Sequence, residues 1–374
     1  MRFKIETKKL LDGLNKVEKA LSRKTLIPIL TGIKFTLVDD GLYLVTSDGS
    51  NVSIKYYLDN NDGSIKVEEK GSIVIPKNII DIIRKVEDKI VSIEVIDGVK
   101  VQVRTEKASF VLNGYEEKEY QDIDFSLNDD YLSIDTEKFK NIINAISFAT
   151  STSESHPILN GINFKIVGDI MELNATDSFR LARAKFNLKE DFDNKNIVIP
   201  TDNLNKFIKI IDTSKKEEME IHFFSNKIIF KNDNLLFLTS LIDGNFPNTA
   251  KLFPSDNKFE LNLDRSNLYN VIDRASILGA DRDKNLIMIS IKDEKMVVSS
   301  SSDGVGNASE EIPIDKKIKD EFKIGFISKT LLESLRNIPG DVVNIKFVAS
   351  DKAITVTDKD NEEITHLLLP MRLY

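Results

Sequence analysis

The sequence has no cysteine and no tryptophan, and it has three histidines among 374 residues. Without cysteine there can be no disulfide, no cysteine-ligated zinc or iron–sulfur site and no thiol nucleophile, which fits a reducing cytosol. No apolar run approaches the roughly 18 residues that span a membrane. The opening MRFKIETKKLL carries charge from residue 2 and lacks an apolar stretch. We therefore expect a cytoplasmic protein with no signal peptide and no membrane partner.

Known catalytic motifs are missing as well. The sequence has no G-x-S-x-G, no P-loop and no G-x-G-x-x-G, and none of the histidines has the i, i+4 partner of a helical metal site. Three short turns, TSDGS, ATDSF and SSDGV, each contain one aspartate without a second carboxylate at fixed spacing. Such an aspartate usually accepts hydrogen bonds from its own backbone. We expect no catalytic residue, no metal and no cofactor.

What the sequence does contain is a threefold repeat. Stretches that begin at Ile29, Ile158 and Asn285 each consist of an alternating strand, a tight polar turn, a second alternating strand and a [ST]-D-[GS] turn. The turn aspartates, 129 and 126 residues apart, are Asp48, Asp177 and Asp303.

The flanking segments repeat too. A short strand and a helical pattern precede each hairpin, and a strand that runs into a second helix follows it. Expected N-caps of the first helices are Thr7, Asp135 or Thr136, and Asp264. The chain therefore reads as an α+β protein of three tandem domains, 1–125, 126–250 and 251–374. Domains that continue each other's sheets can close into a ring if the rotation closes.

Charge is distributed unevenly between the predicted helices and the rest. The chain carries a net charge of −8, but the six predicted helical segments together carry +9 and the remainder −17. If the helices share one face, that face would hold a polyanion by charge alone, without reading sequence. Lysines are common on any solvated helix, but segregation across three repeats favours a function. The segments are 8–24, 76–89, 137–150, 201–216, 264–284 and 328–336.

Five motifs resemble those of one protein family. They are IPIL at 27–30, ILNGINF at 158–164, NATDSFRLA at 174–182, LIDGNFP at 241–247 and LLLPMRL at 367–373. Together with the threefold repeat they resemble, over the whole chain, the bacterial sliding clamps, which are the beta subunits of DNA polymerase III.

The resemblance implies three copies of the DNA-clamp (processivity-fold) domain, each with two helices packed on antiparallel sheets, assembling head to tail as a homodimer into a closed ring. It implies no enzymatic activity, because the ring tethers the replicative polymerase for processive synthesis and a clamp loader opens it. Expected partners are double-stranded DNA, bound without sequence specificity, the polymerase III alpha subunit, the clamp-loader delta subunit and other replication and repair proteins with a clamp-binding motif. The expected location is the nucleoid at replication forks.

In this family the C-terminal tail helps to line an apolar pocket for a motif of the type Gln-Leu-x-Leu-Phe. By motif, the pocket here would use Leu159, Thr176, Ser178, Phe179, Arg180, Leu181, Pro247, Lys251, Leu252, Leu367, Leu368, Leu369, Pro370, Met371 and Arg372. Arg180 and Arg372 could meet a partner's backbone or carboxylate. The tail could also be an edge strand packed into the core, and both roles can coexist if its side chains alternate.

The chain departs from the family pattern in the pocket motif and at its end. The family usually has glycine and then histidine or tyrosine at Ser178 and Phe179, and arginine is common at Lys251. Tyr374 extends past the usual final leucine. These departures bear on the shape of the pocket and on its peptide preference.

Two further surfaces follow from the resemblance and the charge. For DNA contact we expect first Arg23 and Lys24, and then Lys77, Arg84, Lys206 and Lys209. The ring seam would use Phe110 and Leu112 of one subunit against Ile277 and Leu278 of the other, although each of these could also be plain core.

Two rival interpretations belong to other classes. One is a hydrolase or metal enzyme that uses Asp177, Arg180 and His156, and the lack of a second ligand counts against it. The other is a non-DNA scaffold of three tandem α+β domains, which gives no reason for the helices to be basic.

Overall fold

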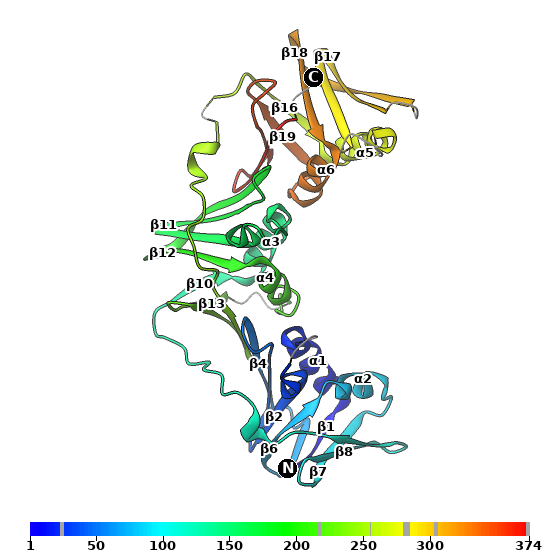
Figure 1. The fold of residues 1–374 in the computed structure, drawn as a ribbon, viewed down its shortest axis with the longest axis vertical. Helices are drawn as coiled ribbons and strands as arrows, with labels where there is room; N and C mark the ends of the chain where they lie inside the picture. The colour runs from blue at the N-terminus through cyan, green and yellow to red at the C-terminus, as the bar shows by residue number, and fades with distance from the viewer. Residues whose placement is uncertain (23–25, 215–217, 255, 280–284, 303–305, 372–374) are drawn as a thin grey trace. The chain divides into compact units, whose positions relative to one another are not determined.

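The computed structural model describes residues 1–22, 26–214, 218–254, 256–279, 285–302 and 306–371. The chain divides into two compact units, residues 1–139 with 202–241, and residues 140–201 with 242–374. Each unit therefore combines one terminal third of the chain with part of the middle third. Figure 1 labels the elements.

The largest sheet of the first unit crosses from the first third of the chain into the middle third. The crossing is made by antiparallel pairing of β15 with β4, from Leu235↔Tyr56 to Thr239↔Val52. The described strands of this sheet are, in spatial order, β10 (Tyr131–Asp135), β13 (Glu218–Phe223), β14 (Lys227–Asn232), β15 (Leu235–Ser240), β4 (Val52–Asp59), β3 (Gly41–Ser47), β2 (Gly32–Val38) and β6 (Gly71–Pro76).

A second sheet of the first unit ends on an exposed edge. Its described strands are, in spatial order, β5 (Ile65–Glu69), β1 (Arg2–Glu6), β7 (Ile90–Asp97), β8 (Lys100–Arg104) and β9 (Ser109–Asn113). The edge strand β9 carries exposed Phe110 and Val111.

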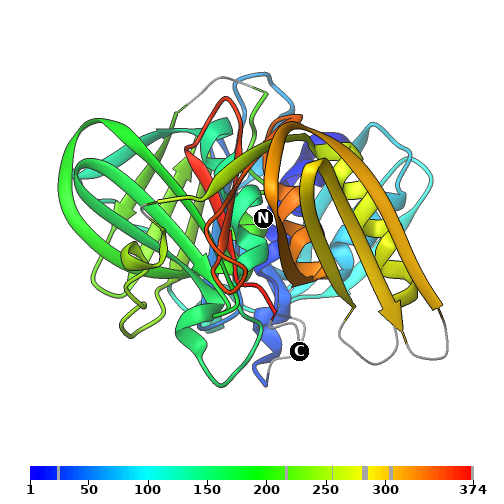
Figure 2. The same cartoon turned by 90° about the horizontal axis from the view of Figure 1, so that it is seen from above.

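The second unit repeats the crossing with the chain's last strand. Here β12 of the middle third pairs with β21 of the last third, from Arg180↔Leu368 to Ala184↔Ile364. The described strands of this sheet are, in spatial order, β11 (Gly161–Thr176), β12 (Arg180–Pro200), β21 (Ile364–Leu368), β20 (Ile354–Asp358), β19 (Val342–Phe347) and β16 (Phe259–Asp264). A separate antiparallel pair consists of β17 (Leu286–Ser302) and β18 (Gly306–Ile327), the long yellow and orange strands of Figure 2.

The tight turns predicted inside the second and third repeats were wrong as turns, because β11 and β17 each run on as one strand and only their register changes there. The pairing of β11 shifts on both sides of Gly168, which has φ +59°. That of β17 shifts on both sides of Asp293, which has φ +53°. Backbone with positive φ bends the chain where a left-handed residue is needed, which glycine and aspartate tolerate best.

Every predicted helical segment contains a helix, which confirms the reading of two helices per third within the described ranges. The helices are α1 (Thr7–Val17), α2 (Asn78–Lys85), α3 (Thr136–Ile146), α4 (Thr201–Phe207), α5 (Arg265–Ser276) and α6 (Ser328–Asn337). Several end earlier than predicted, and α1 passes at Glu18 into one 3-10 turn. Apolar side chains at helical spacing pack the helices on the sheets. In α1, for example, Leu10, Leu14 and Val17 are buried on the side that contacts β3 and β4.

The predicted N-caps had mixed outcomes. Asp264 caps α5 by accepting a hydrogen bond from the Asn267 N–H, and Asp135 accepts one from the Lys138 N–H at 2.7 Å. The prediction for Thr7 was wrong, because Glu6 is the N-cap of α1. The Thr7 hydroxyl instead donates to the Asp88 carbonyl oxygen at 2.6 Å and ties the helix to a loop.

The repeated turn aspartates do what the sequence predicts. Asp48 Oδ1 accepts the backbone N–H groups of Ser50, Asn51 and Val52 at 2.8–3.0 Å. Asp177 Oδ1 accepts those of Phe179 and Arg180 at 3.0 and 3.1 Å. Asp303 lies outside the described residues. Among the helices that the structure describes, none is long and apolar enough to cross a membrane.

Candidate functional site

The C-terminal tail is a buried strand followed by an exposed residue. All five residues of β21 are buried, and Leu367 and Leu368 pair with Leu181 and Arg180 of β12. The next residue, Leu369, is 46% exposed, and its N–H donates to the Phe179 carbonyl oxygen at 3.1 Å. Met371 then pairs with Gly325 through an N–H···O bond of 2.8 Å. Up to Met371, the apolar end is thus docked in the fold, with Leu369 left at the surface. Arg372 lies outside the described residues.

The buried side chain of His366 holds the tail strand, β21, against two helices. Its ring is fully buried, with Nδ1 2.9 Å from the Ser334 hydroxyl on α6 and Nε2 3.0 Å from the Ala145 carbonyl oxygen on α3. The Phe148 ring packs edge-on against it at 4.8 Å between centroids. Burial lowers the pKa of His366 to about 4, so the imidazole is neutral at pH 7 and matches one donor and one acceptor.

The turn beside the tail is held by its own side chains. The Thr176 hydroxyl donates to the Arg180 carbonyl oxygen at 2.6 Å and accepts the Ser178 N–H at 3.1 Å. Ser178 has φ +78°, a left-handed conformation that the turn imposes on a residue other than glycine. The result is that Phe179 points outward, with 67% of its surface exposed.

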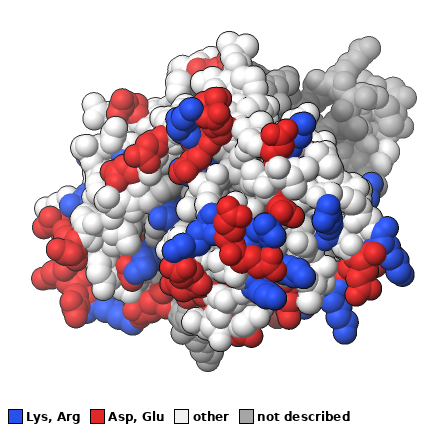
Figure 3. All heavy atoms as spheres, turned by 90° about the horizontal axis from the view of Figure 1, so that it is seen from below, with Lys and Arg blue, Asp and Glu red and all other residues white. Residues whose placement is uncertain are grey.

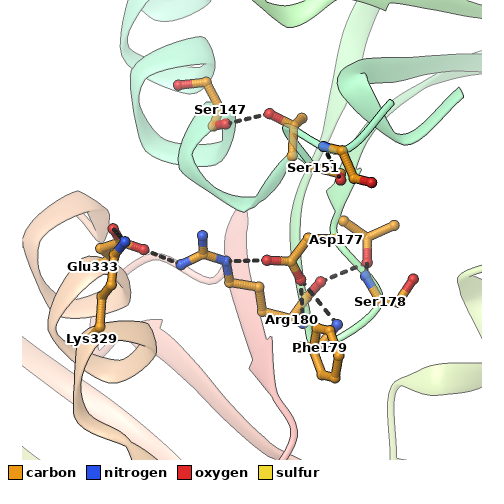
Figure 4. Close-up of polar contacts among 11 residues, drawn as sticks. Ser147, Ser151, Asp177, Ser178, Phe179, Arg180, Lys329 and Glu333 are labelled. Atoms are coloured by element: carbon orange, nitrogen blue, oxygen red, sulfur yellow. Dashed lines mark hydrogen bonds and ion pairs between the residues drawn. The ribbon is translucent and has the colours of Figure 1, made fainter. Parts of the chain in front are cut away.

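Arg180 lies between two carboxylates (Figure 4). Its Nε donates to Asp177 Oδ2 at 3.0 Å, and its Nη1 forms a short ion pair with Glu333 on α6. Its guanidinium carbon lies 5.0 Å from the centroid of the Phe148 ring. The side chain is only 13% exposed. This guanidinium is therefore already neutralised within the chain.

A cavity of about 670 Å³ lies at this turn. It brings together four of the predicted pocket residues, Leu159, Ser178, Phe179 and Arg180. Its other lining residues, which the sequence reasoning missed, are Phe148, Thr150, Ser151, Thr152, Ser153, Ser155, His156, Asp177, Lys329 and Glu333. The run of serine and threonine between 150 and 155 was a visible signal, whereas nothing near α6 in the sequence marks Lys329 or Glu333.

The other predicted pocket residues do not line this cavity: some are buried, some lie on a connecting segment, and in the tail Pro370 and Met371 are half-buried next to exposed Leu369. Thr176, Leu181, Leu367 and Leu368 are buried and support the turn and the tail. Pro247, Lys251 and Leu252 are exposed on the segment that follows β15. That segment is fastened to the β11–β12 sheet by two contacts. The Thr249 hydroxyl donates to Asn174 at 3.2 Å, and the Arg183 guanidinium carbon lies 3.6 Å from the Phe253 ring centroid.

Three of the residues predicted to contact DNA meet in one place in the first unit. Lys77, Lys206 and Lys209, together with Lys19, line an open cavity of about 850 Å³ next to α2 and α4. Three acids, Glu18, Asp48 and Asp81, line it too. Arg23 and Lys24 lie outside the described residues.

Arg84 is engaged differently. It donates to Asp81 at 3.1 Å, to Asn15 at 3.2 Å and to Glu18 at 3.4 Å. Its charge is thus shared with two acids, Asp81 of α2 and Glu18 of the turn after α1. Figure 3, seen from the end of Figure 1 that carries the N-terminal strands, shows basic and acidic side chains interspersed on that face.

The residues predicted for the ring seam lie in different units. Phe110 and Leu112 on β9 line a hollow of about 660 Å³ together with Ile82, Lys85 and Lys107. Ile277, in the 3-10 turn Ile277–Gly279 after α5, is 68% exposed, and Leu278 is half-buried. An exposed apolar edge strand is a template for pairing with another chain.

Comparison with known proteins gives one consistent result. Models of the DNA polymerase III beta subunit match in three successive stretches: the N-terminal domain at 1–124, the central domain at 133–248 and the C-terminal domain at 250–372. Beta sliding clamps of Staphylococcus epidermidis and Staphylococcus aureus are 33% identical to this chain over the whole of both chains.

Solved structures agree. The DNA polymerase sliding clamp of Bacillus subtilis is 34% identical, with a TM-score of 0.94 over the whole of both chains. The DNA polymerase III beta chain of Streptococcus pneumoniae is 28% identical, with the same score and coverage. The chain therefore belongs to the family of bacterial DNA polymerase III beta subunits, the beta sliding clamps.

Proposed function

We propose that this protein closes as a head-to-tail homodimer into a ring around duplex DNA and holds the replicative polymerase at the replication fork. As a member of its family it is a DNA sliding clamp that supports polymerase processivity. The domain bounds that we propose are 1–125, 126–250 and 251–374.

The observation that carries the DNA contact is the meeting of lysines from separate elements. Lys77 precedes α2, whereas Lys206 lies on α4 and Lys209 just beyond it, and all three line one cavity. Lysines that meet phosphates bind DNA of any sequence and release it readily, which permits sliding. Arg23 and Lys24 would add to this surface. Because Arg84 is already paired with two acids, we expect it to contribute less.

The proposed docking pocket is the cavity beside the tail, where exposed Phe179 is an apolar wall and exposed Leu369 lies next to it on the tail. The occupant that we propose is the Gln-Leu-x-Leu-Phe motif of the polymerase III alpha subunit, of the clamp-loader delta subunit and of other replication and repair proteins. Three lining side chains, Phe148, Leu159 and Phe179, are apolar and can receive the apolar side chains of the motif, and the polar lining residues can hydrogen-bond its backbone and its glutamine. In the ring, Phe110 and Leu112 would meet Ile277 and Leu278 of the partner subunit.

We also propose that the protein performs no catalytic step of its own and needs no cofactor. A hydrolase that used Asp177 and Arg180 would need these groups free to act on a substrate. Instead, Asp177 is occupied by two backbone N–H groups and the Arg180 guanidinium, and Arg180 by two carboxylates. Across the described ranges, no three metal-binding side chains lie close enough to hold a metal ion.

The test of the DNA contact is the double variant Lys206→Glu/Lys209→Glu, with Lys4→Glu/Lys66→Glu as a matched control. The control lysines are exposed and paired across β1 and β5, outside the lysine-lined cavity. Removing two phosphate contacts should weaken DNA binding. It should also make the slope of log K against log salt less negative by roughly two, because fewer counterions are released on binding. The control should bind like the unaltered protein. Equal binding by both variants would show that Lys206 and Lys209 do not contact DNA.

A further inference from the structure

Helix α6 contacts two paired strands, β12 and β21, through two consecutive residues, and the first residue of β12, Arg180, lines the candidate pocket. Glu333 forms the ion pair with Arg180, the first residue of β12. Ser334, the next residue of the helix, is 2.9 Å from His366 of β21. Arg180 and Leu368 pair directly across the two strands, so a single turn of α6 holds the turn at one end of β12 and the tail strand beside it.

The ion pair spans a long stretch of sequence. Glu333 and Arg180 are 153 residues apart, and the pair joins the middle third of the chain to the last third. At the same guanidinium, Asp177 adds a local contact within the turn. Of the two carboxylates, the one from α6 therefore fixes where the turn lies, and the one from Asp177 fixes the shape of the turn itself (Figure 4).

The turn carries the exposed wall of the cavity. Phe179 immediately precedes Arg180, and its carbonyl oxygen accepts the Leu369 N–H at 3.1 Å. Any displacement of Arg180 would move Phe179 and loosen its contact with Leu369. Both of these side chains are exposed and apolar, Phe179 in the lining of the cavity and Leu369 beside it, so together they offer an apolar surface to a peptide.

We propose that Glu333 is a positioning residue of the peptide pocket. It holds Arg180, and through Arg180 the turn with Phe179, at the spacing from Leu369 that an apolar peptide motif requires. Arg180 and Lys329 carry two positive charges and Asp177 and Glu333 two negative ones, so the formal charges at this wall balance. The inference rests on the proposed docking function of this cavity.

The test is binding of a fluorescent peptide, acetylated and amidated, with the sequence Gln-Leu-Ser-Leu-Phe. Glu333→Gln keeps the size of the side chain and one hydrogen-bond acceptor but removes the charge. Because the pair is only partly exposed, its loss should weaken binding roughly fivefold to tenfold, chiefly through faster dissociation. Glu362→Gln is the matched control, since Glu362, in the connection between β20 and β21, forms an ion pair at 2.8 Å with Lys346 of β19.

A double-mutant cycle with Arg180→Met separates positioning from general damage to α6. If Glu333 acts through Arg180, then Glu333→Gln in the Arg180→Met background should change peptide affinity less than twofold. If the full loss persists there, Glu333 acts by another route and the proposal is overturned. Melting temperatures and DNA retention of each variant verify that the rest of the molecule is intact.

The outcomes distinguish this inference from the docking function. If the unaltered protein binds the peptide and Glu333→Gln binds it equally well, the pocket stands and the positioning role is overturned. If the unaltered, folded protein does not bind, the docking function fails and the positioning role fails with it. Weaker binding by Glu333→Gln, no change in Glu362→Gln and no further loss beyond Arg180→Met would establish the proposal.

Discussion

The Nε2 atom of His366 lies 3.0 Å from the carbonyl oxygen of Ala145 at the end of α3. Since a carbonyl can only accept, Nε2 carries the proton and Nδ1 accepts from the Ser334 hydroxyl 2.9 Å away. The neutral ring satisfies both neighbours without water. This bond ties the last strand of the chain to the middle third, and it makes the docking of the tail sensitive to protonation.

The first prediction concerns acid stability. The pKa of His366 is about 4 in the folded protein against 6.5 as its ordinary value, so the unfolded state binds the proton first as pH falls. The stability contributed by this group is complete above pH 6.5, is lost as pH falls toward 4 and changes little below that. The loss amounts to roughly 3 kcal/mol.

The measurement is the free energy of unfolding of the protein at several pH values, for the unaltered protein and for His366→Gln. Because glutamine does not titrate, the difference between the two proteins should change by the expected amount between pH 6.5 and 4. A difference that stays constant with pH would show that His366 is not buried as a neutral ring.

The second prediction contrasts two neighbouring leucines. Leu368 is fully buried in β21, so Leu368→Ala should lower the free energy of unfolding by about 2–5 kcal/mol. Leu369 is half exposed, and Leu369→Ala should cost less than about 1 kcal/mol but weaken binding of the Gln-Leu-Ser-Leu-Phe peptide. Denaturant unfolding and peptide titration of both variants check this. The same effect on stability from both would contradict the division between core and surface.

The third prediction concerns the segment that follows β15. Arg183 stacks on Phe253 with 3.6 Å between the guanidinium carbon and the ring centroid, and burial lowers the pKa of Arg183 despite the nearby Glu172. A double-mutant cycle of Arg183→Met and Phe253→Leu should give a coupling energy of roughly 0.5–2 kcal/mol. The readout is the free energy of unfolding. Additive single effects would mean that the stacking does not hold the segment.

The fourth prediction compares two helix N-caps. Asp264 accepts the Asn267 N–H at 2.6 Å, so Asp264→Ala should destabilise α5 and the protein by about 0.5–2 kcal/mol. Glu6, the N-cap of α1, makes no side-chain capping bond, so Glu6→Ala should have little effect. Thermal unfolding of the two variants gives the comparison, and a larger loss from Glu6→Ala would contradict the assignment.

Local chemistry was predictable from the sequence. The repeat, the six helices and the aspartates at positions 48 and 177 all follow from periodicity and turn chemistry over a few residues. The burial of Leu367 and Leu368 could be predicted too, because an apolar segment is rarely exposed to solvent.

Contacts between distant parts of the chain were not predictable. The sequence near Arg180 does not predict its ion pair with Glu333. The sequence near Arg84 does not predict its ion pair with Glu18, on the turn after α1. The cap expected at Thr7 failed for the same reason, since its hydroxyl found the Asp88 carbonyl oxygen, 81 residues away. A side chain's partner is set by tertiary packing, which local propensity does not encode.

The central claim is that the protein encircles DNA, and the most direct measurement is retention on a nicked circular plasmid before and after linearisation. The cognate clamp loader places the labelled protein on the circle, and gel filtration separates bound from free protein. A ring that slides should stay on the circle and be lost once a restriction enzyme creates ends. Equal retention on circular and linear DNA would contradict encirclement and indicate ordinary surface binding.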